Sequence, residues 1–317
     1  LHLSLRRQRQ MCIRDRNIAI KIPNADRDER IGSVFNHLFS VILQNEIYGE
    51  GDNIIWDFSN TSFFHPFFLF PFAIYRSKCK TNIDCKNLPS YMRSYLSCVR
   101  FFDMLTIEDD EGLKEALKEY LVKSYIPICR FSRLNKNIDS MQTIIQSVVE
   151  KQKQLDARLK TPISYLISEL VCNIDQHSDS EFGYIYTQYL SKENSLDICI
   201  ADDGITIYGS YVKTQKMIEE IGDNEAEALK FANEGYSTKN LPEAENRGFG
   251  ISSTKSMIVE GLGGAFFMLS GGAFHRHDIN GSSYVRLPES ISWDGTVILM
   301  RIPLTVNNSF DYMKYIR

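Results

Sequence analysis

One stretch limits the fold of this chain more than any other, residues 161–178, TPISYLISELVCNIDQHS. Its apolar residues recur every three or four positions, which predicts an amphipathic helix with one buried face. Pro162 suits the first turn of a helix, and we expect Thr161 before it to cap the N-terminus. Glu169 and Asn173 fall one turn apart on one side of this helix. Such polar residues on a half-buried helix are costly unless they serve a site, and an ordinary solvated face is the alternative.

Three stretches downstream join this helix in a fixed order. Residues 196–207, LDICIADDGITI, predict an alternating strand that ends in Asp202 and Gly204. Residues 246–251, NRGFGI, predict a glycine-containing turn that opens an apolar helix, and residues 295–304, GTVILMRIPL, predict a last strand. Taken together, the four stretches resemble the ATP-binding domain of the GHKL superfamily, which includes gyrase-type ATPases, histidine kinases and anti-sigma-factor kinases.

The resemblance implies a Bergerat-type α/β sandwich, with helices on a mixed sheet, over residues 161–305. It also implies a site for ATP and Mg²⁺. In that site Glu169 is the expected general base, Asn173 the expected magnesium ligand and Asp202 the acceptor for the adenine amino group. The other expected ATP-binding residues are Gly204, Lys239, Arg247, Gly248, Gly250 and Thr296.

The residue types suit these roles chemically. Magnesium prefers hard oxygen ligands and keeps several waters, so one amide oxygen suffices. At the position where adenine carries the amino donor that Asp202 would bind, guanine has none. Glycines let the backbone at a helix N-terminus approach phosphates. Thr296 would reach Asp202 or a water beside adenine. Each residue also has a plainer interpretation: a strand-ending turn for Asp202, a solvated loop lysine for Lys239 and an ordinary strand threonine for Thr296.

Some positions fit the resemblance less well or lie outside it. The superfamily pattern usually has a second glycine where Thr206 stands, and a β-branched residue there restricts the backbone, which puts fast turnover in doubt. His177 extends the polar stripe, with an ATP-site role and a structural role equally weighted. His275 and His277 have no third metal ligand nearby in sequence, so we expect surface residues.

Residues 17–130 predict a smaller α/β domain, with strands near residues 18–22 and 53–58 and a phenylalanine-rich helix from Pro66. The unit around Asp57 and Ser59 resembles the strand-loop-helix of STAS domains, whereas the phosphorylatable serine of that family is replaced by His65 and Pro66. We expect His65 to be a helix-start residue. A long helix is predicted over residues 139–159, inside a linker over residues 131–160, and a tail over residues 306–317.

The first sixteen residues differ from the rest of the chain. They carry five arginines and one aspartate and lack apolar periodicity, so we expect a non-native leader; a basic arm or transit peptide is the alternative. The whole chain has a net charge of −4, so the remaining residues carry about −8. That negative charge argues against nucleic-acid binding by the rest of the chain. The seven scattered cysteines predict reduced thiols in a cytoplasmic protein.

Two functions follow from the resemblance. The first is an ATPase or a serine/threonine protein kinase in which Glu169 activates a water or a partner's hydroxyl. The second is a nucleotide-gated interaction module with little turnover, in which the STAS-like domain or a dimer contact meets a protein partner. A histidine autokinase is less favoured because no histidine lies between His65 and His177. We expect neither a membrane nor a nucleic acid as a partner.

Overall fold

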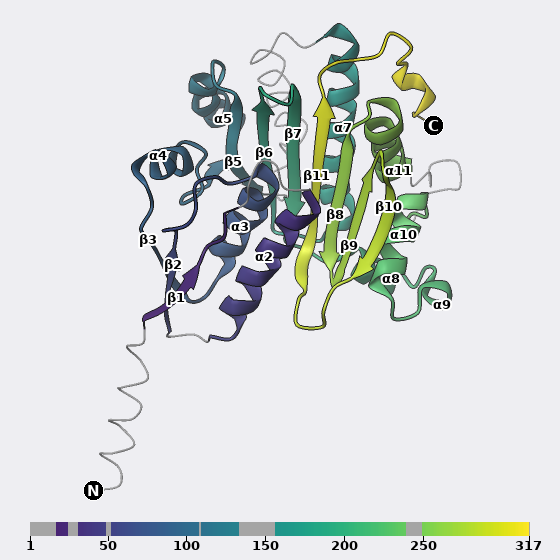
Figure 1. Ribbon diagram of the computed structural model, residues 1–317. Coiled ribbons are helices and arrows are strands. Elements are labelled where there is room, and N and C mark those ends of the chain that lie inside the picture. The colour runs from purple at the N-terminus through teal and green to yellow at the C-terminus, as the bar shows by residue number, and fades with distance from the viewer. Residues whose placement is uncertain are drawn as a thin grey trace, which may run out of the picture. The chain divides into compact units, whose positions relative to one another are not determined.

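The computed structural model describes residues 17–24, 31–48, 52–107, 109–132, 156–238 and 249–316. The chain divides into an N-terminal unit, Leu1–Asp103, and a C-terminal unit, Met104–Arg317. Both contain helices and parallel or mixed sheets, which confirms the predicted α/β class (Figure 1). The sequence places the boundary near residue 131, whereas the structure places it after Asp103. The expected leader, and the linker helix as far as residue 155, lie outside the described residues.

The N-terminal unit is a three-stranded parallel sheet with helices in the crossovers and a further helix after the last strand. Its elements are β1(Asn17–Lys21), α2(Ile31–Glu46), β2(Asn53–Asp57), α3(Pro66–Lys78), β3(Asn82–Lys86) and α4(Ser90–Cys98). The strands follow the order β1-β2-β3, and α2 contacts α3. The strands β1 and β2 and the helix α3 confirm the predictions. The strand β3 is not among the predicted elements, although Ile83 and Cys85 alternate with polar residues in its sequence; none of its residues is buried.

The helix α3 begins as the sequence predicts. The ring Nδ1 of His65 accepts a hydrogen bond from the backbone N–H of Phe67 at 3.2 Å, and Pro66 takes the first helical position. His65 is therefore the helix-start residue, as expected. Every residue from Pro66 to Ile74 is buried, which explains the apolar character of the whole stretch. In the part of the chain that the structure describes, no helix is long and apolar enough to cross a membrane.

The C-terminal unit is built on one eight-stranded sheet, in the order β10-β9-β8-β11-β7-β6-β5-β4. Its strands are β4(Leu105–Ile107), β5(Tyr125–Ser132), β6(Phe182–Leu190), β7(Ser195–Asp202), β8(Ala265–Gly271), β9(Ala273–Asp278), β10(Gly281–Arg286) and β11(Trp293–Pro303). All neighbours are antiparallel except β4 and β5. Because β5 pairs with β6, the segment that the sequence assigns to the first domain belongs to the second unit.

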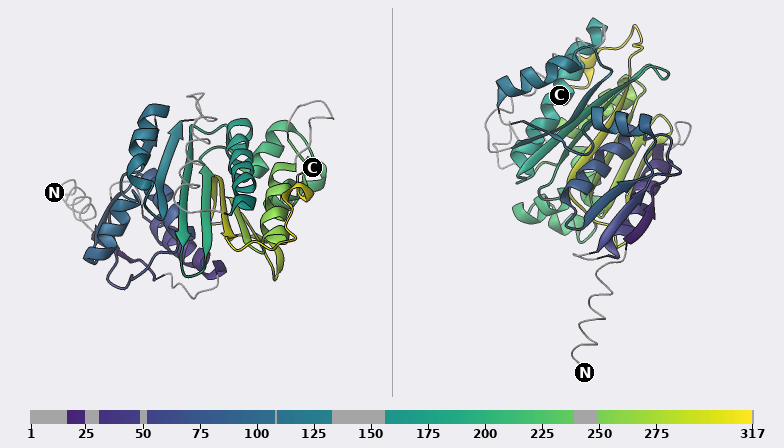
Figure 2. Two further views of the ribbon diagram at one scale, coloured as in Figure 1. Left: turned by 90° about the horizontal axis from the view of Figure 1, so that it is seen from above. Right: turned by 90° about the vertical axis from the view of Figure 1, so that its left-hand side faces the viewer.

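The predicted central helix is α7(Ala157–His177), which lies against the sheet of the C-terminal unit (Figures 1 and 2). Its apolar stripe enters the core through Leu159, Ile163, Leu166, Ile167, Leu170, Val171 and Ile174. The expected N-terminus is wrong. The helix starts at Ala157, because the carboxylate of Asp156 accepts a hydrogen bond from the backbone N–H of Arg158 at 2.9 Å. Thr161 and Pro162 therefore lie inside the helix.

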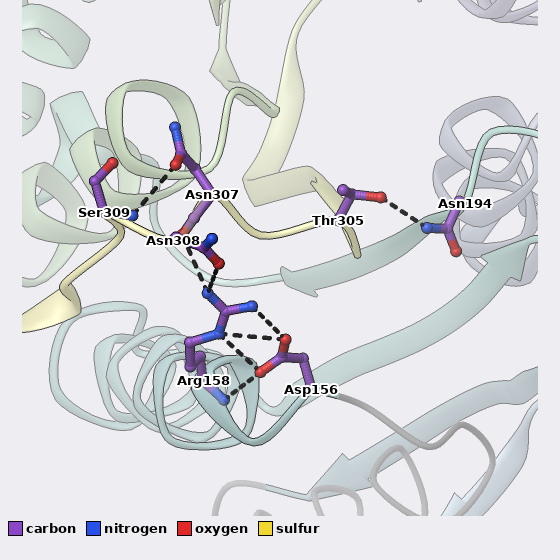
Figure 3. Close-up of polar contacts among 7 residues, drawn as sticks. All are labelled: Asp156, Arg158, Asn194, Thr305, Asn307, Asn308 and Ser309. Atoms are coloured by element: carbon purple, nitrogen blue, oxygen red, sulfur yellow. Dashed lines mark hydrogen bonds and ion pairs between the residues drawn. The ribbon is translucent and has the colours of Figure 1, made fainter.

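The segment after β11 is fastened to the same unit (Figure 3). The amide of Asn194, in the turn between β6 and β7, donates to Thr305 Oγ1 at 3.1 Å. The guanidinium of Arg158 donates to Asn307 O at 3.3 Å and to Asn308 Oδ1 at 3.2 Å. Apolar contacts with the core come from Val306, Phe310, Tyr312, Tyr315 and Ile316. The residues expected to form a tail thus bind back to the start of α7.

The histidines of β9 differ from the prediction of surface residues. His275 is fully buried, with its Nδ1 3.1 Å from Ser283 O and its ring stacked 4.0 Å from the ring of Tyr284. Burial, together with the positive charge of Lys255, lowers the pKa of His275 to about 3. The neutral ring therefore donates from Nδ1 to the Ser283 carbonyl.

We predict a pH-dependent stability from this buried ring. The unfolded chain protonates a histidine below about pH 6.5, whereas the folded protein keeps His275 neutral down to about pH 3. The free energy of unfolding should therefore fall as the pH drops through this window, by up to about 1.4 kcal/mol per pH unit. Urea unfolding of wild type and His275→Phe at pH 7 and pH 5 measures this, since phenylalanine keeps the stack on Tyr284 but does not titrate. Equal slopes in the two proteins would contradict it.

The cysteines of the described residues are all free thiols. Cys129 and Cys199 are buried and Cys98 is exposed, so only part of the set packs in the core. Burial raises the pKa of Cys199 well above its usual value. A buried, protonated thiol behaves as a small apolar group, which agrees with the expected reduced state.

Candidate functional site

One pocket of the C-terminal unit collects residues that are far apart in the chain. It is lined by the second half of α7, the end of β7, the helix α8(Ile207–Thr214), the start of α11(Phe249–Ser256) and β11. Its volume is about 890 Å³ including the open mouth. Five of the nine predicted site residues line it: Glu169, Asn173, Asp202, Gly250 and Thr296.

Two of these residues come from α7 and meet the backbone of α11. A Cβ atom on Gly250 would lie 2.5 Å from Glu169 Oε2 and 3.6 Å from Asn173 Nδ2. The start of α11 therefore approaches the polar stripe of α7 closely, and a side chain at position 250 would displace the Glu169 carboxylate. The contact brings two separate sequence motifs together.

Asp202 ends β7 and has only 6% of its surface exposed. Its Oδ1 accepts a hydrogen bond from the backbone N–H of Gly204 at 3.0 Å, which fixes the carboxylate in the turn. The adjacent Asp203 has a different task. Its two oxygens accept from the backbone N–H of Phe182 at 3.1 Å and from the hydroxyl of Tyr184 at 3.2 Å. Asp202 lines the pocket, whereas Asp203 holds the start of β6.

Gly295 of β11 lies directly against Asp202, and Thr296 follows it in the strand. Gly295 has a φ of +79°, and a Cβ there would stand 2.3 Å from the backbone oxygen of Asp202. Only glycine fits this backbone conformation and spacing. Thr296 is 8% exposed, and its Oγ1 lies 3.1 Å from Ser270 Oγ. The sequence predicts Asp202 or a water as its partner and gives no indication of Ser270, which resembles any other serine in an apolar strand.

Thr206 explains the missing second glycine. Its backbone is extended, with a φ of −69° and a ψ of 166°, so no glycine is needed there. Its hydroxyl accepts a hydrogen bond from the backbone N–H of Gly209 at 2.9 Å and thereby caps α8. Thr206 thus starts α8, a helix that the sequence pattern does not predict.

The helix α8 holds the chain that follows α10(Glu225–Glu234). Ser210 Oγ lies 2.8 Å from Thr238 Oγ1, and the hydroxyl of Tyr211 donates to the carbonyl of Tyr236 at 2.5 Å. Gly235 ends α10 with a φ of 96°. Asn224 caps the start of α10, since its Oδ1 accepts the first backbone N–H groups.

Four further predictions lie outside the described residues: Lys239, Arg247, Gly248 and the side chain of His177. The helix expected after residues 246–251 is confirmed, since α11 starts at Phe249 and continues into the π-helical turn η2(Met257–Gly261).

The residues around Glu169 and Asn173 fit a magnesium ion held mainly by ligand oxygens. The amide nitrogen of Asn173 is buried and has no hydrogen-bond partner among the described residues. A 180° rotation of the amide exchanges its nitrogen and oxygen, so a hard oxygen donor can occupy this position. Among the described residues, no group of three or more histidines, cysteines or acids is arranged to hold a metal. Burial and the charge of Glu169 raise the pKa of Tyr165, one turn earlier on α7, so its hydroxyl stays protonated.

The start of α11 contributes positive partial charge to the pocket, beside the negative charge of Glu169. Its first turn contains no acidic residue, and its N-terminus carries the positive end of the helix dipole. An anionic group in this part of the pocket would meet backbone N–H groups on one side and the Asn173 amide on the other. The pocket thus has a hydrogen-bond acceptor at its buried end and can bind an anion at the end formed by α11.

No model of a known protein family matches the sequence, and the curated proteins contain no match to it.

Proposed function

We propose that the C-terminal unit binds Mg-ATP in the manner of the GHKL superfamily and uses it for hydrolysis or phosphoryl transfer. The observation that carries this proposal is the pocket itself. It unites Glu169, Asn173, Asp202, Gly250 and Thr296, which the superfamily resemblance selects from four separate stretches of sequence. Residues that were chosen by motif and not by position have little reason to share one pocket unless they share a ligand.

The adenine end is supported by the surroundings of Asp202. The carboxylate is nearly buried and held by Gly204, and apolar residues such as Ile200, Ile205 and Ile298 line the pocket around it. A carboxylate has about four acceptor sites, so it can accept an exocyclic amine besides the Gly204 N–H. A carbonyl oxygen in the same place would face negative charge. This arrangement favours adenine over guanine.

The phosphate end is supported by α7 and α11. Asn173 would hold the magnesium ion, which neutralises phosphate charge and orients the terminal phosphoryl group. The N-terminus of α11, with Gly250 close to α7, would face the phosphates. Glu169 would accept the proton of the attacking water or hydroxyl as the new bond to phosphorus forms and ADP leaves.

Calorimetric titration with Mg-ATP and Mg-GTP tests the proposal on the full chain. We expect Mg-ATP to bind at least about tenfold more tightly, because guanine presents a carbonyl to Asp202 and cannot donate an amine there. A magnesium-free titration in the presence of a chelator should show weaker binding. Equal affinity for the two nucleotides, or no binding of either, would contradict the proposal.

A second candidate is a nucleotide-gated interaction module with little turnover. The observation that favours it is α8, which both lines the pocket and holds residues 236–238 through Ser210 and Tyr211. Occupation of the pocket can therefore alter a surface beside it without chemistry. The N-terminal unit would then meet a partner as a STAS-like domain. That resemblance is supported by the parallel β1-β2-β3 order and by Asp57, whose Oδ1 accepts from the backbone N–H of Ser59 at 3.0 Å.

A further inference from the structure

Ser270 on β8 lies behind the adenine end of the proposed ATP pocket. Its side chain is 2% exposed and does not line the pocket. Three groups surround its hydroxyl oxygen: the carbonyl of Gly295 at 2.9 Å, the backbone N–H of Ile207 at 2.9 Å and Thr296 Oγ1 at 3.1 Å. Ser270 therefore connects the start of α8 with the part of β11 that touches Asp202.

The directions of these hydrogen bonds follow from valence. A serine hydroxyl has one proton to donate and two lone pairs to accept with. Gly295 lies in the irregularity of β11 between Trp293 and Thr296, where it pairs with neither neighbouring strand. Because its carbonyl has no strand partner there, it accepts the proton of Ser270. The N–H of Ile207 occupies one lone pair of Ser270. Full pairing of these buried groups then requires Thr296 to donate its own proton to the second lone pair.

This assignment fixes what Thr296 can offer a ligand. Its proton is committed to Ser270, so its oxygen presents only lone pairs to the pocket that it lines. Asp202 beside it also only accepts. We infer that Ser270 is a positioning residue that sets the polarity of Thr296, so that the pocket selects a heterocyclic amine and rejects a carbonyl at the same place. The inference rests on the proposed nucleotide site and names a determinant of its specificity.

The experiment compares ATP with ITP, which replaces the amino group of adenine by a carbonyl. Calorimetric titration with magnesium gives the ratio of the two affinities for wild type and for Ser270→Ala. Without Ser270, Thr296 can turn its proton towards the pocket and donate to the carbonyl. We expect the preference for ATP to fall by about 5–10-fold, the value of one hydrogen bond. Ser270→Cys keeps the size of the side chain and should change the ratio in the same direction, because sulfur accepts weakly.

A double-mutant cycle separates this role from a general loosening of the pocket. In a Thr296→Val background, the hydroxyl that Ser270 orients is gone, so Ser270→Ala should leave the ATP-to-ITP ratio unchanged. A similar change in both backgrounds, or an unchanged ratio in both Ser270 variants with ATP still bound, would overturn the role of Ser270 alone. Failure of the wild type to bind ATP would overturn the proposed function and this inference with it.

Discussion

Glu169→Gln is expected to lower ATP turnover or phosphoryl transfer by about 10²–10⁴-fold, the usual contribution of a positioned general base. Glutamine keeps the size of the side chain but cannot take up the proton of the attacking group. Asn173 is untouched in this variant, so the affinity for Mg-ATP should stay within about threefold of wild type. A coupled assay of ADP release measures turnover, and calorimetry measures affinity on the same preparation.

The matched control is Glu289→Gln, which removes one negative charge from an exposed position outside the pocket. It should leave both turnover and affinity unchanged. If Glu169→Gln hydrolyses ATP at the wild-type rate, Glu169 is not the base. If wild type and variant both bind ATP and neither turns it over, the nucleotide-gated module is the correct function. The same pair of measurements thus distinguishes the two candidate functions.

Asp202→Asn is expected to weaken Mg-ATP binding by about 10–150-fold, because a hydrogen bond to a charged group is worth roughly 1.5–3 kcal/mol. The nearly isosteric amide keeps the shape of the pocket but loses the charge and places a donor beside the adenine amine. The effect on Mg-GTP should be much smaller, since the carbonyl of guanine gains that donor. Titration of both nucleotides against the variant measures the change.

The adjacent aspartate provides the control. Asp203→Asn has the same change of charge one residue away, at a side chain that binds Phe182 and Tyr184. It should lower the free energy of unfolding and leave the affinity of the folded protein for ATP nearly unchanged. Unchanged affinity for ATP in Asp202→Asn, or equal losses of affinity in both variants, would contradict the assignment of Asp202 as the residue that binds adenine.

The sequence by itself determined the elements whose signal is local. The apolar stripe of α7 alternates at helical spacing, so its existence and its buried face were predictable. The hairpin β6–β7 and the strands β8 and β11 follow from short apolar runs. Five residues of the pocket come from the superfamily resemblance, whose motifs are short and local in the sequence.

Other features were decided only by tertiary structure. The sequence predicts Thr161 as the cap of α7, whereas the carboxylate of Asp156 accepts a backbone N–H at the observed start of the helix. Strand β5 joined the C-terminal sheet through pairing with β6, which is fifty residues away in the chain and invisible to periodicity.

The polar residues show most clearly which features the tertiary structure decides. Nothing in the sequence around His275 marks it as buried, because its burial depends on the strands and rings packed around it. Thr206 looked like a defect in a glycine motif until its hydroxyl was found to cap α8. Ser270 acquires its role from three partners on α8 and β11, none closer than twenty-five residues in sequence. Local patterns record which face of an element is apolar, whereas hydrogen-bond partners are set by where distant elements meet.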